Sequence, residues 1–335
     1  MTNSDSNLTL SSEHANIVIS GASQGKRAIH VEPMNGDFIP VRNWTTSYPL
    51  ELIEHVLKVK GAAYLCDEIM RDEDPSYVQH HFEWDILSYV DKETFRATRI
   101  LDFGAGCGSS TMVLARMFPH AEIVSVDLVS EFIELARHRA EHYGFSDRVK
   151  VLPSPGPSRL PHELGTFDFV ILSAVYEHLL PCEREVLLPL LWQHLKPKGI
   201  VFINQTPYRW FPIEVHTTGL PLINYLPDSI ALLICRRFSK RVAKNESWND
   251  LLRRGIRGAT MNEIGRILEG NDCTGELLLP TKKGMKDHID LWFGLSSTTR
   301  QPAIKKVMKL MFKALHTMSG VVMVPYLSLA IRKIG

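Results

Sequence analysis

The sequence of 335 residues has no long hydrophobic run and almost no net charge. Its best candidate for a membrane span, residues 320–331, is shorter than the roughly 18–20 residues that cross a bilayer, and it contains Pro325. The formal net charge of +1 gives no reason to expect a nucleic-acid partner. Residues 1–16 lack the apolar centre of a secretory signal. They are rich in Ser, Asn and Thr with little to bury, so we expect them to be disordered.

Cysteine is scarce, and the five cysteines are scattered along the chain. No CxxC pair or other short metal-binding spacing occurs, which argues against a zinc site and against a disulfide scaffold. We therefore expect no metal, reduced thiols and a cytoplasmic protein. The cysteines are Cys66, Cys107, Cys182, Cys235 and Cys273.

The pattern of apolar residues divides the chain into five parts. Residues 1–48 form an N-terminal segment with a small hairpin-like element, and residues 49–97 read as helices interrupted at Pro75. Apolar strands and amphipathic helices then alternate through residues 98–207. This alternation predicts an α/β fold with a doubly wound, mostly parallel, seven-stranded sheet.

The alternation stops after Pro207, and residues 208–286 are rich in proline and aromatic residues. We interpret them as a cap insert over the ligand-binding face of the sheet, with helices at residues 247–258 and 260–270. In the last part, residues 287–335, two closing strands are expected at residues 287–296 and 326–333. A basic amphipathic helix separates them.

The strongest local signal is the run ILDFGAGCGSST at residues 100–111. An apolar strand ends near Asp102, and Gly104, Gly106 and Gly108 lead into a helix. Glycine permits a tight turn and a close approach of the backbone to a ligand at a helix N-terminus. The next strand ends in Asp127, where a carboxylate can accept hydrogen bonds from ribose hydroxyls.

Taken with VSVD, FDFVILSAVYEHL and LKPKGIVFIN, this run resembles the motifs of class I S-adenosylmethionine-dependent methyltransferases, in the right order across residues 100–205. The resemblance implies S-adenosyl-L-methionine as cofactor and S-adenosyl-L-homocysteine as product. It implies that the glycine loop holds the methionine end and that Asp127 binds ribose. The acidic residue usual after the third strand is missing, and Ser154 stands in that region. The expected cofactor contacts are Asp102, Gly104, Ala105, Gly106, Gly108, Asp127, Leu128, Ser154 and Ser173.

Loops at the carboxyl ends of parallel strands are where ligands bind in this architecture. We expect a small-molecule acceptor there, methylated most simply on a hydroxyl oxygen, with His216 or else His178 as the base. Glu214 either orients His216 or is a solvated carboxylate. Both histidines could instead be structural, and the aromatic residues could be core of the cap. The expected substrate contacts are Tyr176, Tyr208, Arg209 and Trp210.

Other functions stay open at this point. Methylation at carbon, nitrogen or sulfur is compatible with the same motifs, as is a catalytically silent cofactor-binding module. Before the glycine loop, four side chains either touch the cofactor or form an exposed, salt-bridged helix face: Tyr64, Asp67, Glu68 and Arg71.

The basic helix at residues 303–319 carries four lysines within about 100° of arc, with apolar residues on the remainder. No acidic residue follows Asp290. One interpretation is a helix that packs on the sheet with its lysines in water. The other is peripheral contact with an anionic membrane or a lipid-linked substrate. The sequence leaves the oligomeric state open. The lysines are Lys305, Lys306, Lys309 and Lys313.

Overall fold

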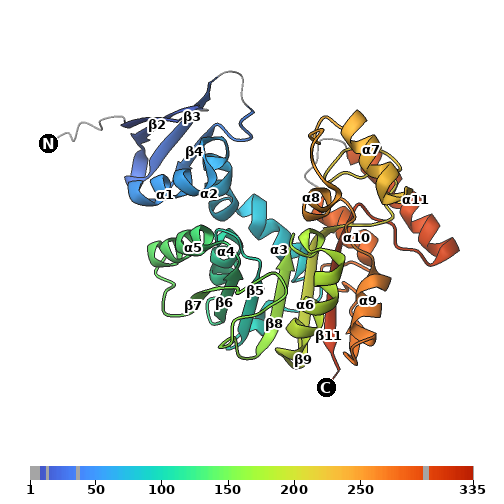
Figure 1. The fold of residues 1–335 in the computed structure, drawn as a ribbon. Helices are drawn as coiled ribbons and strands as arrows, with labels where there is room; N and C mark the ends of the chain where they lie inside the picture. Colours follow the sequence, from blue (N-terminus) through green and yellow to red (C-terminus); the bar gives the residue numbers. More distant parts are fainter. Residues whose placement is uncertain (1–7, 13–14, 35–37, 297–301, 335) are drawn as a thin grey trace. The chain divides into compact units, whose positions relative to one another are not determined.

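A computed structural model describes residues 8–12, 15–34, 38–296 and 302–334 (Figure 1). The chain divides into two compact units. Unit 1 comprises Met1–His80, Ala105–Pro119 and Ile123–Pro153, and unit 2 comprises His81–Gly104, His120–Glu122 and Ser154–Gly335. The predicted disorder of residues 1–7 and 13–14 lies outside the described residues.

Unit 1 begins with an antiparallel sheet of four strands in the order β1-β2-β3-β4. The strands are β1 (Leu8–Ser11), β2 (Ala15–Gly21), β3 (Arg27–Pro33) and β4 (Asn43–Thr46). The predictions of disorder up to residue 16 and of a mere hairpin were therefore wrong for the described residues. Alternate residues such as Ile17 and Ile19 are buried in one apolar cluster with α1 (Leu50–Lys60) and α2 (Leu65–Glu73), so packing stabilises strands that look too polar alone.

The rest of unit 1 carries the glycine loop. It contains α4 (Ser109–Met117), β6 (Glu122–Asp127), α5 (Ser130–His142) and β7 (Val149–Pro153), with β6 and β7 paired in parallel. These bounds agree with the predicted alternation. The break predicted at Pro75 is also present, since the short helical turn Pro75–Gln79 separates α2 from α3 (His80–Asp85).

Unit 2 contributes β5 (Arg99–Phe103), β8 (Phe167–Ser173), β9 (Leu195–Pro207), β10 (Gly275–Leu277) and β11 (Tyr326–Lys333). The seven-stranded sheet has the order β10-β11-β9-β8-β5-β6-β7. Pairs β5–β8 and β8–β9 are parallel, whereas β11 is antiparallel to both β9 and β10. The α/β class and the mostly parallel seven-stranded sheet are confirmed. The order reverses between β5 and β8, where such sheets bind ligands outside their carboxyl ends.

Helices of unit 2 pack on this sheet and on one another. α6 (Pro181–Gln193) contacts β9 and α9 (Met261–Glu269), and α10 (His288–Leu295) contacts β11 and α11 (Pro302–Ser319). The strand predicted at residues 287–296 is thus wrong: Asp287 caps a helix by accepting hydrogen bonds from the N–H groups of Ile289 and Asp290. An apolar run of this length fits a buried strand or a buried helix equally well, and the cap decides between them.

The segment 208–286 is only partly a separate layer. α7 (Asp228–Phe238) and α8 (Trp248–Arg253) share a small apolar core that includes Ala231, Cys235 and Leu251. The helix predicted at residues 260–270 is present as α9, whereas α8 covers only the first half of the helix predicted at residues 247–258. However, α9 packs on α6, and β10 pairs with β11 at the edge of the sheet. The cap assignment stays a prediction and applies best to residues 208–256.

All five cysteines are free thiols. Among the described residues, no helix is long and apolar enough to cross a membrane.

Candidate functional site

The glycine loop has the backbone that its sequence predicts. Gly104, Gly106 and Gly108 all have positive φ, at 72°, 55° and 84°. A Cβ at Gly108 would lie 2.6 Å from the Ala136 Cβ, so only glycine lets the start of α4 pack on α5. Nothing lies within 4 Å of a Cβ built at Gly106, which leaves open space above the loop. The loop therefore offers a backbone cradle with room for a ligand.

Asp127 holds this loop directly. Its Oδ2 accepts the N–H of Gly106 at 2.8 Å, and its Oδ1 accepts the N–H of Val129 at 3.1 Å. Each carboxylate oxygen can accept a further hydrogen bond, so these contacts leave acceptor capacity for ribose hydroxyls. Leu128, the next residue, is exposed. Asp127 thus couples the end of β6 to the conformation of the loop, a role that the motif did not reveal.

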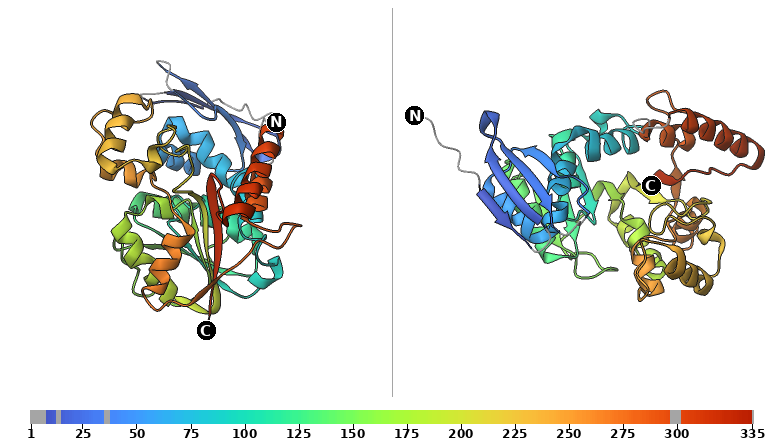
Figure 2. Two further views of the ribbon diagram at one scale, coloured as in Figure 1. Left: turned by 90° about the vertical axis from the view of Figure 1, so that its right-hand side faces the viewer. Right: turned by 90° about the horizontal axis from the view of Figure 1, so that it is seen from above.

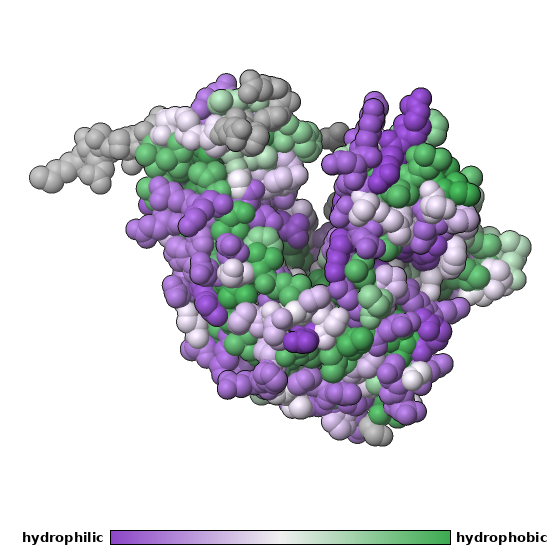
Figure 3. Space-filling model, in the orientation of Figure 1, coloured by the Kyte–Doolittle hydropathy of each residue, from purple (hydrophilic) through white to green (hydrophobic). Residues whose placement is uncertain are grey.

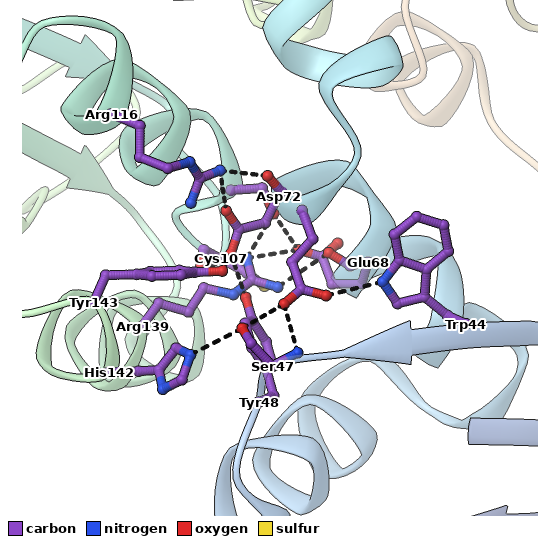
Figure 4. A network of polar contacts seen from close by, with 12 residues as sticks. Trp44, Ser47, Tyr48, Glu68, Asp72, Cys107, Arg116, Arg139, His142 and Tyr143 are labelled. Carbon is purple, nitrogen blue, oxygen red and sulfur yellow. Dashed lines mark hydrogen bonds and ion pairs between the residues drawn. The ribbon is translucent and has the colours of Figure 1, made fainter. Parts of the chain in front are cut away.

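A buried ion pair between Arg139 and Glu68 contacts the backbone of the glycine loop (Figure 4). Arg139, on α5, is fully buried and donates to the Glu68 carboxylate at 3.0 Å and to the backbone oxygen of Cys107 at 2.9 Å. It also donates to the Ser109 hydroxyl at 2.6 Å. The burial of Glu68 raises its pKa, but Arg139 and Lys60 outweigh that effect and hold the pKa below its ordinary value. Helix α2 is therefore locked to the glycine loop.

The other candidates before the loop are more peripheral. Glu68 was predicted either to touch the cofactor or to lie on an exposed, salt-bridged face, and it forms the salt bridge but is buried. Arg71 lies over the Tyr77 ring, with its guanidinium carbon 5.3 Å from the ring centroid, and Tyr64 is exposed. Burial raises the pKa of Asp67.

In unit 2 the predicted cofactor residues lie at the carboxyl ends of β5 and β8. Asp102 is buried, and Ser173 is partly buried and lies opposite Asn204 in the parallel pairing of β8 and β9. A Cβ at Gly104 would lie 2.7 Å from a Val175 methyl group, so the start of the glycine loop abuts the segment that leaves β8. The Ser154 hydroxyl donates to the backbone oxygens of a local turn, at Gly156 and Arg159.

A compact group of three side chains follows these strands. Three side chains, Glu177, His178 and His216, each offer one atom that could bind a metal ion, and these three atoms lie within 4.8 Å of one another. The ring centroids of the two histidines are 5.6 Å apart. Two segments far apart in the sequence meet here, because His178 follows β8 and His216 follows β9. The predicted pair of histidines is thus brought together, and the set could also bind a divalent cation.

Glu177 is the member that the sequence did not suggest. It is fully buried, its Oε2 accepts the Thr206 hydroxyl at 3.2 Å, and its Oε1 is 3.9 Å from the Nε2 of His178. Oε1 has no hydrogen-bond partner. Burial raises the pKa of Glu177 to about 7. In the motif Tyr-Glu-His, only the histidine was predicted to be catalytic. The sequence does not indicate that the glutamate side chain is buried.

The two imidazoles are kept neutral by their surroundings. Burial lowers the pKa of His178 and of His216, and each ring is partly exposed. The Nδ1–H of His178 donates to the backbone oxygen of Arg253 at 2.7 Å, which leaves Nε2 as the acceptor of the neutral ring. Gly255 fits against this pair: with φ at 87°, its Cβ would lie 2.9 Å from the His216 ring and 3.0 Å from Glu177 Cγ.

Glu214 does not orient the His216 ring. Its buried carboxylate accepts the backbone N–H of His216 at 2.9 Å, those of Thr217 and Thr218, and the Thr218 hydroxyl. The expectation of a solvated carboxylate or a ring-orienting acid is therefore corrected. Glu214 fixes the turn that presents His216, because a carboxylate satisfies several adjacent N–H groups at once.

The predicted substrate contacts are mostly used within the protein. Tyr176 is fully buried, and its ring lies under the Arg184 guanidinium at 4.8 Å. Tyr208 is buried beside the end of β9. Arg209 donates to the backbone of Asn224 and stacks on Trp210 at 4.4 Å, and Trp210 itself remains 43% exposed. Of the four, Trp210 alone presents a large free surface.

A family model described as a methyltransferase domain matches residues 100–199. This span includes the glycine loop, Asp127 and the segment from β8 to His178. Residues 100–199 form a class I S-adenosylmethionine-dependent methyltransferase domain. Glu214 and His216 lie beyond the matched span of this methyltransferase domain, in the segment that the chain adds after β9. Enzymes of this family use S-adenosylmethionine.

The relatives of the methyltransferase domain share only part of their length with it. An O-methyltransferase hkm8 of Aspergillus hancockii is 30% identical over 119 residues, which are 35% of this chain and 46% of that protein. A carboxy-S-adenosyl-L-methionine synthase of Hydrogenovibrio crunogenus is 27% identical over 109 residues, 32% and 42% of the two chains. The solved structure of an O-methyltransferase family protein from Burkholderia thailandensis covers 84% of this chain and 61% of its own, at 13% identity and a TM-score of 0.45.

Proposed function

We propose that this protein transfers the methyl group of S-adenosylmethionine to a hydroxyl oxygen of a small-molecule acceptor. The observation that carries the proposal is the group of Glu177, His178 and His216. It follows β8 and β9, strands whose carboxyl ends share one edge of the sheet with that of β5, from which the glycine loop starts. An alcohol needs a base near neutral pH, and two neutral imidazoles supply one.

The loop geometry fits the cofactor. Gly106 leaves room above the backbone, and Asp127 has spare acceptor capacity for ribose. We expect Ala105 and Gly108 to flank the bound methionine end, with Asp102, Ser154 and Ser173 close to it. When bound, S-adenosylmethionine supplies a methyl group on a positively charged sulfur, which an aligned nucleophile attacks in line.

His178 is the preferred proton acceptor. Its Nδ1–H is held by the backbone of Arg253, so its Nε2 can accept the acceptor's hydroxyl proton as the oxygen–methyl bond forms. The resulting imidazolium lies beside Glu177 Oε1, and the ionised form of Glu177 stabilises it. His216 either takes the same role or binds the acceptor. The relative named as an O-methyltransferase supports oxygen as the target, whereas the synthase shows how widely the chemistry of similar domains varies.

Two measurements test this function. A calorimetric titration with S-adenosylmethionine should show binding. A catalytically silent cofactor-binding module would bind as well but would transfer no methyl group. Cofactor labelled with carbon-13 in its methyl group, incubated with cell extract, should then give a labelled small molecule whose methyl chemical shift in nuclear magnetic resonance is that of a methyl ether. Label on carbon, nitrogen or sulfur would refute the choice of oxygen.

A chelator distinguishes base catalysis from metal assistance at the same three side chains. We expect turnover to survive prolonged treatment with EDTA, because a neutral imidazole needs no metal. Loss of turnover with EDTA, restored by a divalent cation in the native protein but not in His178→Ala, would assign the group to a metal ion instead.

A further inference from the structure

In α11, part of the lysine-bearing side faces the protein and the apolar side faces outward, the reverse of a basic helix with its lysines in water. Lys313 forms ion pairs with Asp287, the cap of α10, at 2.5 Å and with Asp290 of α10 at 3.0 Å, and Lys309 pairs with Asp290 at 2.9 Å. Phe312 is buried against Trp292, with ring centroids 5.2 Å apart. Two of the four lysines therefore anchor the helix to the protein.

The apolar side of α11 is left uncovered as a result. Leu310 is 70% exposed and Met318 is 80% exposed, values normal for a lysine and unusual for an ordered helix of a globular protein. The exposed residues recur at steps of three, four or seven, so they form one stripe along the helix. The stripe consists of Ile304, Val307, Leu310, Met311 and Met318.

A second helix of unit 2, α7, also has large apolar side chains exposed. On α7, Leu233 is 69% exposed and Phe238 is 65% exposed, and Ile230 lies on the same side. Figure 1 shows α7 and α11 toward the same end of unit 2, and the left view of Figure 2 shows them on opposite sides of that end. Figure 3 shows apolar patches among hydrophilic ones over it. We call the exposed apolar residues of α7 and α11 the docking face.

Positive charge borders the docking face. Arg237, Lys240 and Lys244 are exposed on and after α7, and Lys306 is exposed on α11. In the sequence no acidic residue follows Asp290. A second copy of this chain would bring cation against cation, whereas an anionic lipid surface accepts both the apolar side chains and the charges.

We propose that the docking face binds the surface of an anionic lipid bilayer, with α7 and α11 lying in the interface. This inference does not depend on the proposed methyl transfer. The helices lie on the bilayer rather than cross it, because α11 is 18 residues long and carries four lysines. Apolar side chains would enter the boundary between head groups and acyl chains, and the bordering cations would meet lipid phosphates.

The test uses the full-length protein and flotation with vesicles of phosphatidylcholine, with or without phosphatidylglycerol. We expect binding to the anionic vesicles that weakens with salt, since exposed charges are screened. Leu233→Glu and Leu310→Glu should each reduce the partition coefficient by about tenfold or more. Arg237→Gln and Lys306→Gln should each reduce it by about fivefold.

Val186→Glu is the matched control, because Val186 on α6 is also half exposed but lies outside the docking face. It should bind as the native protein does, and all variants should keep native circular dichroism and cofactor affinity. Three results would overturn the proposal: no flotation of the native protein, equal binding to uncharged vesicles, or a dimer in sedimentation that Leu310→Glu dissociates. Loss of methyl transfer alone would leave it intact.

Discussion

Replacing Arg139 by methionine should both destabilise the protein and loosen the glycine loop. The guanidinium is fully buried and donates to the carboxylate of Glu68, to the backbone of Cys107 and to the hydroxyl of Ser109. Methionine keeps most of the volume but leaves the Glu68 charge buried. The Glu68 carboxylate then keeps only two of its partners, the Ser109 hydroxyl at 2.9 Å and Lys60 at 3.8 Å.

The loss in the free energy of unfolding depends on the Glu68 charge, which remains buried without its partner. Removing one partner of a buried ion pair costs about 3–5 kcal/mol, because the other charge remains without compensation. Urea unfolding followed by circular dichroism at neutral pH measures this loss. The loop carbonyl of Cys107 also loses a charged donor, worth about 1.5–3 kcal/mol, so we expect cofactor affinity to fall by about ten- to a hundredfold in calorimetry.

The control is Arg266→Met. Arg266 forms an ion pair with Glu185 at 3.3 Å, but both side chains are more than half exposed, so its loss should cost no more than about 1 kcal/mol. The double variant Glu68→Gln/Arg139→Met should recover part of the stability, since it strands no charge. The reasoning fails if Arg139→Met and Arg266→Met lose the same amount, or if the double variant is the least stable of all.

Five further outcomes are expected. Asp127→Ala should weaken cofactor binding by a few kcal/mol at most, through lost ribose contacts and a freed Gly106 N–H, and unchanged affinity in a titration would count against the assignment. His178→Ala and His216→Ala should bind the cofactor normally, and whichever histidine is the base should lose turnover by about a hundredfold to ten-thousandfold. The native rate should fall on the acid side of a midpoint below the ordinary imidazole value, because burial lowers both histidine pKa values and a protonated ring accepts no proton. Gly255→Ala should reduce turnover while sparing cofactor affinity, because its Cβ would lie 2.9 Å from the His216 ring; native kinetics in this variant would place the ring outside the reaction. Finally, the folded pKa of Glu177 is raised to about 7, so native stability should decline as pH rises from the ordinary glutamate range through 7, and Glu177→Gln should flatten this slope in urea titrations at several pH values.

The sequence by itself determined the cofactor half of the protein. A strand, a glycine loop, a helix and a second strand ending in Asp127 follow one another without interruption, so their arrangement is a local property of the chain. Each glycine is needed for a backbone angle or a close approach that neighbouring residues dictate. The alternation of residues 98–207 likewise determined the parallel sheet, because burial on both faces leaves a periodic apolar pattern.

Only the tertiary structure decided which side chains meet. Glu177 lies against His178 and His216 because β8 and β9 end side by side, and Gly255 fits against them from a segment much later in the chain. The spacing of these residues in the sequence does not predict that they are in contact. The direction in which a side chain points after a turn depends on the backbone angles of that turn, and here those are set by the Glu214 hydrogen bonds.

The same limit explains the closing segment. Periodicity showed that residues 303–319 form an amphipathic helix, but not which of its two sides faces the protein. Asp287, which caps α10, and Asp290, in its first turn, determine this, because they form ion pairs with Lys309 and Lys313 on the side that faces the protein. That α10 is a helix at all depends on Asp287 capping its N-terminus. An amphipathic pattern determines that a helix has two faces, and only its packing partners determine which face remains outside.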